Sequence, residues 1–160
     1  MKNLAESIKI YTELIEKGDI QTAYRGIMDF FGYLRVSFSK TYPQYEIGNL
    51  YQGYMDMTYF SITTDRLKSK GLKVAIVYLH AQSAFEVWLS ARNRSMAKTF
   101  VPLFSSDVML KLNAFHDMEN PDAIVERKIV EYPDFDSQDD LAKLILQETE
   151  RFVTEIGDHI

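Results

Sequence analysis

The fold of this chain is decided between residues 72 and 91, where the sequence reads LKVAIVYLHAQSAFEVWLSA. Leu72–His80 is the strongest strand signal in the chain, and Phe85–Ala91 has the same β-branched and aromatic character. Ala81–Ser83 connects the two stretches as a tight turn. They therefore predict an antiparallel β-hairpin, although the turn lacks the Asn-Gly or Asp-Gly pair that would define the register of its strands.

Two further segments have strand character. Tyr54–Ile62 is rich in residues that favour strands and contains neither Gly nor Pro, while Ile124–Glu131 alternates between apolar and polar residues. Most connections between these segments are too short for the crossover that parallel strands require. The sequence thus predicts a four-stranded, mostly antiparallel sheet.

Apolar residues recur with a helical period at both ends of the chain. The N-terminal stripes consist of Leu4, Ile8, Tyr11 and Ile15, followed by Ile20, Tyr24, Ile27, Phe31, Leu34 and Phe38. Gly18-Asp19 provides a helix stop and a new N-cap between the stripes, which predicts an antiparallel αα-hairpin. A third stripe, from Leu141 to Ile156, predicts a C-terminal helix packed on the sheet. We expect one α+β domain spanning residues 1–160.

Composition narrows the class of protein. The chain has 160 residues, no cysteine and a formal net charge of −5. Disulfides and thiolate metal sites are therefore excluded, and nucleic acid is an unfavourable partner because phosphate binding needs a basic surface. The longest apolar run, Val74–Leu79, falls far short of the about 20 residues that cross a bilayer. We expect no membrane association and a location in the cytoplasm.

The hairpin carries the first candidate site. If His80 lies opposite Ala84, then Tyr78 faces Glu86. The polar side chains of Tyr78, His80 and Glu86 then share one face of the hairpin with Trp88. A histidine, a carboxylate and a phenol within reach of one another suit proton transfer or the binding of a polar ligand. A register shifted by one residue would dissolve this cluster, because it moves a strand's side chains to the other face.

The second candidate site is Arg92-Asn93-Arg94, where the hairpin passes into a helix predicted over residues 94–100. Asn93 is a favoured N-cap, so the following backbone N–H groups point outward. Two arginines bracketing a helix N-terminus are electrostatically unfavourable, and a bound phosphate or carboxylate would offset this. The alternative is that neighbouring acids pair with the arginines, since carboxylates outnumber basic residues by 23 to 18.

These sites favour non-catalytic binding of a small anionic or polar ligand, or of a protein partner. The alternative is an enzyme, a hydrolase or a metal-dependent nuclease, using Asp56, Glu86 and His80. Nucleases of the restriction type place a lysine two residues after the acid, but here Trp88 follows Glu86. No nucleotide or metal-binding motif is present, so we expect no cofactor and no metal. A third alternative is a homodimer built through the N-terminal helices.

Two segments, Gly71–His80 and Phe85–Arg94, resemble a family of bacterial hypothetical proteins of similar length. The resemblance would extend over nearly the whole chain. It implies a small bacterial protein of the cytoplasm and brings no established activity. No catalytic residue can be transferred from that family to this sequence.

Overall fold

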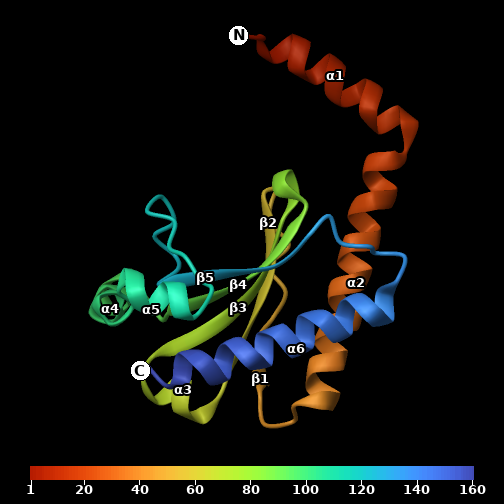
Figure 1. Cartoon of the computed structure of the whole chain (residues 1–160). Helices are drawn as coiled ribbons and strands as arrows, with labels where there is room; N and C mark the ends of the chain where they lie inside the picture. The colour runs from red at the N-terminus through yellow and green to blue at the C-terminus, as the bar shows by residue number, and fades with distance from the viewer.

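The computed structural model describes residues 1–160 as an α+β fold (Figure 1). The helices are α1 (Leu4–Lys17), α2 (Asp19–Thr41), α3 (Asp65–Ser69), α4 (Arg94–Phe100), α5 (Ser106–Lys111) and α6 (Gln138–Gly157). The strands are β1 (Glu46–Ile47), β2 (Met57–Thr63), β3 (Leu72–Leu79), β4 (Ala84–Ala91) and β5 (Val125–Glu131). Two 3-10 turns, His80–Gln82 and Val101–Leu103, complete the regular structure.

The sheet has five strands in the order β1-β2-β3-β4-β5, and every neighbouring pair is antiparallel. The predicted α+β class and antiparallel sheet are confirmed, but the predicted number of four strands is wrong. The additional strand is β1, in which Glu46 lies opposite Thr63 of β2. Two residues are too few to show the alternation by which a strand is recognised in a sequence.

The hairpin between β3 and β4 forms, but its register differs from the predicted one. Leu79 lies opposite Ala84, which places Tyr78 opposite Phe85, and Val77 opposite Glu86. The predicted pairing of Tyr78 with Glu86 is therefore wrong by one residue. The cause is the connection, in which a 3-10 turn starting at His80 is followed by Ser83 with a left-handed φ of 48°.

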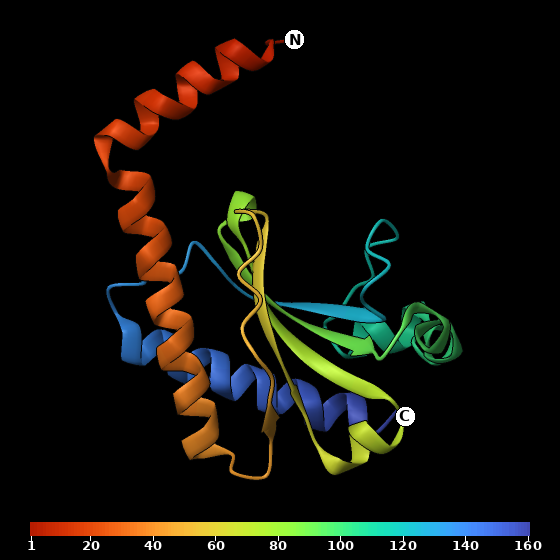
Figure 2. The ribbon, with the colours of Figure 1, turned by 180° about the vertical axis from the view of Figure 1, so that it is seen from behind.

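Helices α2 and α6 cover one face of the sheet, and the main core lies between them and the strands (Figure 2). Aromatic residues of α2 meet aromatic residues of the sheet there. The ring of Phe30 lies 5.8 Å from that of Phe85, and the ring of Phe31 lies 6.1 Å from that of Phe60. Phe152 of α6 is fully buried in the same core. The predicted packing of the C-terminal helix on the sheet is confirmed.

The two predicted N-terminal helices are present, but they do not form an antiparallel hairpin. Gly18, with φ of 83°, is the only residue between them, because α2 already begins at Asp19. A reversal of direction between helices takes a loop of about 2–5 residues. The single glycine therefore produces a bend, and α1 projects from the body of the protein (Figure 1) without one buried residue.

Candidate functional site

A pocket of about 200 Å³ lies on the sheet face opposite α2 and α6. Strands β2, β3 and β4 form its floor with Tyr59, Ala75 and Trp88. These residues share one face because Ala75 is paired with Trp88 across the β3–β4 ladder, and Tyr59 lies on the neighbouring strand. The small side chain of Ala75 beside the indole leaves room above the strands. The floor is thus largely aromatic.

Three basic side chains and one acidic side chain line the same pocket. Lys73 reaches it from β3, while Arg92 and Arg94 flank the junction between β4 and α4. Lys73 and Arg92 form no ion pair within the chain. Arg94 pairs with the acidic residue, Asp122, at 3.4 Å, and both partners are exposed to solvent. Of the two predictions for the arginines, the internal ion pair is therefore realised for Arg94 alone.

The backbone at this junction is fixed by two hydrogen bonds. Asn93 accepts a hydrogen bond of 2.9 Å from the N–H of Met96, so the predicted N-cap of α4 is confirmed. The backbone N–H of Arg92 donates to the carbonyl oxygen of Gly71 at 2.8 Å. The Asn93 side chain serves the helix, and the two guanidinium groups beside it provide the charge at the pocket.

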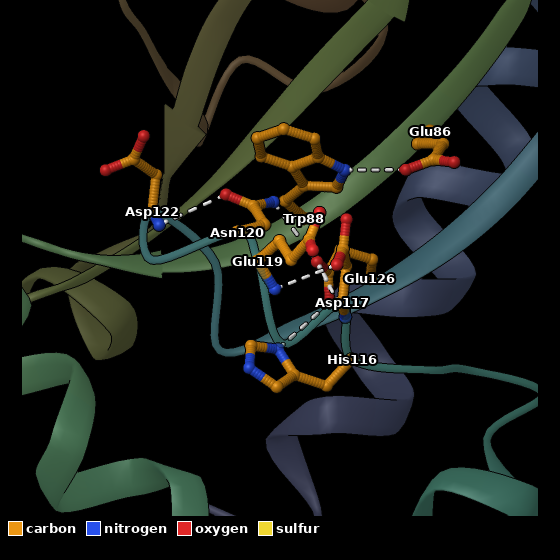
Figure 3. A network of polar contacts seen from close by, with 8 residues as sticks. All are labelled: Glu86, Trp88, His116, Asp117, Glu119, Asn120, Asp122 and Glu126. Carbon is orange, nitrogen blue, oxygen red and sulfur yellow. Dashed lines mark hydrogen bonds and ion pairs between the residues drawn. The ribbon is translucent and has the colours of Figure 1, made fainter. Parts of the chain in front are cut away.

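The opposite wall is a loop held by the buried carboxylate of Glu126 on β5 (Figure 3). Glu126 accepts hydrogen bonds from the backbone N–H of Asp117 at 3.3 Å and from the Asn120 amide at 3.1 Å. The ring of His116 lies 3.3 Å from the same carboxylate. Asn120 in turn accepts from the N–H of Asp122 at 3.1 Å. Burial raises the pKa of Glu126, and these hydrogen bonds and the charge of His116 oppose that shift.

Glu86 lies beside the pocket floor and fixes Trp88. Its carboxylate accepts a hydrogen bond of 2.9 Å from the indole N–H, and both side chains are buried (Figure 3). Two of the four residues predicted to form a cluster on the hairpin therefore do lie together. Their contact runs along β4, between residues two apart, rather than across the hairpin.

The other two members of that predicted cluster, Tyr78 and His80, are separated from Glu86 and Trp88. Tyr78 is buried in the main core under α2 and α6, on the opposite face of the sheet. The His80 ring lies 5.0 Å from the ring of Tyr78 and 5.9 Å from that of Tyr24 on α2. The shift of one residue in the register produces this separation, and the predicted gathering of the four side chains on one face is wrong.

The contacts of His80 hold neighbouring elements of the fold together. Its Nε2 lies 2.8 Å from the hydroxyl of Thr58, which itself donates to the carbonyl oxygen of Gln52 at 2.7 Å. Because a hydroxyl has one proton to give, Nε2 of His80 is the donor to Thr58. Burial lowers the pKa of His80, and the charge of Asp56 opposes the shift. His80 thus links β2, the β3–β4 turn and α2.

Asp56, Glu86 and His80, the residues of the enzyme alternative, are also divided by the sheet. Asp56 lies next to His80. The backbone N–H of His80 donates a hydrogen bond of 3.0 Å to the backbone carbonyl oxygen of Asp56. The Asp56 carboxylate accepts a backbone hydrogen bond from Tyr54 at 2.9 Å, and such bonds lower the pKa of Asp56. Glu86 is on the opposite face of the sheet. No three His, Asp or Glu side chains in the chain are grouped so that they could hold a metal ion.

Sequence reasoning missed the wall of the pocket and part of its floor. Glu126 falls within the predicted strand Ile124–Glu131, but no motif marks it as part of a site, and Asp122 lies outside the predicted strands and helices. The turn around Pro121 was the one local signal in that loop. Tyr59 follows the alternation of β2, but which face it occupies depends on the whole sheet.

None of the helices is both long and apolar enough to cross a lipid bilayer.

Comparison with known proteins gives one match. A family described as "Domain of unknown function (DUF7000)" matches residues 4–160. Neither the curated proteins nor the solved structures include a match to the chain. The expected resemblance to an uncharacterised family is thereby confirmed. Because the match leaves out only the first three residues, the chain belongs to the DUF7000 family.

Proposed function

We propose that this protein binds a small organic anion in the pocket above Trp88, without catalysing a reaction on it. The observation that carries the proposal is the position of Lys73 and Arg92. Both line the pocket, and neither has an acidic partner. An anion placed between them would supply the missing countercharge.

The charge around the pocket is opposite in sign to that of the protein. The chain has a formal net charge of −5, whereas the pocket lining has three basic groups and one acidic group. Basic groups gathered in a concave site concentrate the positive potential there and attract anions. Lys73 and Arg92 are two such groups, and neither is neutralised by an ion pair. Their position at this concave site supports anion binding.

The ion pair of Arg94 with Asp122 leaves Arg94 available to a ligand. An exposed pair of this kind contributes about 0–1 kcal/mol to stability. A guanidinium group binds a carboxylate or phosphate through two parallel hydrogen bonds, which is a stronger arrangement. A ligand anion can therefore displace Asp122 at little cost. Arg92, which has no such partner, needs no displacement.

The floor and the size of the pocket define the rest of the ligand. The half-buried ring of Tyr59 and the small exposed part of Trp88 offer aromatic surface, which favours an apolar or aromatic ligand body. The volume of about 200 Å³ is below the roughly 300–1,000 Å³ of sites for drug-sized molecules. A ligand the size of an aromatic monocarboxylate fits this description. Benzoate is therefore a suitable probe.

Isothermal titration calorimetry tests this function with three probes: benzoate, inorganic phosphate and benzylamine. We expect benzoate to bind, phosphate to bind more weakly because it lacks an apolar body, and benzylamine, which has the opposite charge, not to bind. The double variant Lys73→Ala/Arg92→Ala should bind benzoate at least about tenfold more weakly, a loss of about 1.4 kcal/mol.

The matched control is Lys98→Ala/Lys111→Ala, which removes the same charge from residues that do not line the pocket. It should bind benzoate as the unaltered protein does. Absence of benzoate binding to the unaltered protein would contradict the proposal. Equal loss of affinity in both double variants would show that only the overall charge of the chain matters, and would also contradict it.

A further inference from the structure

Helix α1 presents an apolar face that the rest of the chain leaves largely uncovered. Leu4, Ile8 and Tyr11 are 75%, 52% and 63% exposed, and no residue of α1 is buried. The ends of the helix are stabilised locally, by a capping box of Asn3 with Glu6 and by Gly18 at the C-cap. Helices of this length are marginal in water without a packed face, since most helical stability comes from tertiary packing. The face is therefore expected to have a partner.

We propose that the partner is a second copy of this chain, and that two α1 helices pack antiparallel, face to face, in a homodimer. The apolar stripe has the spacing 4-3-4 along Leu4, Ile8, Tyr11 and Ile15. This spacing is symmetric about the middle of the helix. A two-fold axis there places Leu4 against Ile15 of the second copy, and Ile8 against Tyr11 of the second copy. The contact is self-complementary and closed, as in most homodimers.

The distribution of charge favours a second copy over other partners. Residues 1–17 contain three Lys and three Glu, so the acidic excess of the chain lies entirely outside α1. The charged residues lie on the side of α1 away from the stripe, as the helical period requires. Two α1 helices can therefore meet without net repulsion. Because α1 projects from the body (Figure 1), the two acidic bodies stay apart.

A membrane surface is a poorer match for the same face. Helices that lie on anionic membranes have a polar face rich in Lys and Arg, which attracts the lipid headgroups. The polar face of α1 balances its three Lys with three Glu, and the body behind it is acidic. Neither feature attracts an anionic membrane.

The exposed apolar area is of the size that a weak dimer needs. Leu4, Ile8, Tyr11 and Leu14 together expose on the order of 450 Å² per copy, taking about 200 Å² for a fully exposed large side chain. Two copies would bury about 900 Å², which is in the range of weak, transient interfaces. We therefore expect a reversible dimer whose population depends on concentration.

Size-exclusion chromatography with light scattering on the full chain tests this. We expect a mass that approaches twice 18.6 kDa as the concentration rises. The variant Ile8→Glu/Tyr11→Glu should remain a monomer at every concentration, with the circular dichroism of the sheet unchanged because neither residue is buried. The control Lys9→Gln/Glu13→Gln, on the polar face of the same helix, should still dimerise. A monomer at all concentrations, or a dimer that survives Ile8→Glu/Tyr11→Glu, overturns the proposal.

Cysteine cross-linking tests the direction of the helices, because the natural chain has no cysteine. We expect a mixture of Leu4→Cys and Ile15→Cys chains to form mainly the mixed disulfide. Parallel helices would instead link Leu4→Cys chains to each other, and that result would overturn the antiparallel arrangement. Co-sedimentation of the unaltered monomer with phosphatidylglycerol vesicles, without dimers in solution, would identify a membrane as the partner and would overturn the dimer.

Discussion

Trp88 donates its indole N–H to the carboxylate of Glu86, two residues earlier on β4, at 2.9 Å. Both side chains are buried, although they lie on the sheet face opposite the main core. A buried polar group is costly unless it has a hydrogen-bond partner, and each of these groups supplies one to the other. Glu86 therefore holds Trp88 of the pocket floor in place from beside the pocket.

Replacing Glu86 by Leu should destabilise the fold by about 1–3 kcal/mol, because the buried indole N–H then has no acceptor. Urea unfolding followed by circular dichroism measures this change. The informative comparison is a double-mutant cycle with Trp88→Phe, which removes the N–H itself. In the Trp88→Phe background, Glu86→Leu should cost less by about 1 kcal/mol or more. Equal costs in both backgrounds would show that the hydrogen bond does not couple the two residues.

Glu126 should control the pocket without touching the ligand. Glu126→Ala removes the acceptor for the Asp117 N–H and the Asn120 amide, so the loop that carries Asp122 loses its anchor. We expect faster hydrogen exchange at residues 116–122 and weaker benzoate binding by about tenfold.

The control for this experiment is Glu119→Ala, an exposed acid in the same loop whose side chain forms no hydrogen bond with it. It removes the same charge and should leave both the exchange rates and the affinity unchanged. If Glu126→Ala leaves hydrogen exchange in the loop unchanged, then the carboxylate does not anchor it.

His80 should make the stability of the fold depend on pH. Burial lowers the pKa of His80 in the folded protein from its ordinary value of 6.5. Below pH 6.5 the unfolded chain takes up this proton more readily than the folded chain does, so the contribution of His80 is complete above that pH and is lost as the pH falls. The free energy of unfolding, measured by urea titration, should therefore decrease less toward acid in His80→Gln than in the unaltered protein. His159→Gln, at the C-terminus, serves as the control, and an unchanged slope in His80→Gln would refute this role.

Much of the fold could be predicted because the strands and helices carry their own signals. The hairpin of β3 and β4 and the cap at Asn93 follow from residue types close in sequence. The register of the hairpin could not be predicted, because it depends on the left-handed backbone conformation of Ser83. A glycine or asparagine at that position would have indicated such a conformation in the sequence. Similarly, the stripe of α1 predicts a helix but gives no information about where that helix points after Gly18.

The part of the candidate site that is formed by residues close together in the sequence could be predicted. Arg92 and Arg94 are adjacent to the cap that places them, and both line the pocket. Glu86 and Trp88 do lie together, but Tyr78 and His80 do not, because one residue of register moves a strand's side chains to the other face. The pairing of Arg94 with Asp122 joins residues 28 apart in the sequence. Such a contact follows from the path of the loop, which no local pattern describes.

The most direct measurement of the central claim uses Trp88, the only tryptophan in the chain, as a probe of the pocket floor. Titration of the unaltered protein with benzoate should change the Trp88 fluorescence along a saturable curve, because the ligand body rests against the indole. The Lys73→Ala/Arg92→Ala variant should give the same signal only at about tenfold higher benzoate, or more. Fluorescence that does not respond to benzoate, or that responds identically in that variant, would contradict the binding of an anion at this site.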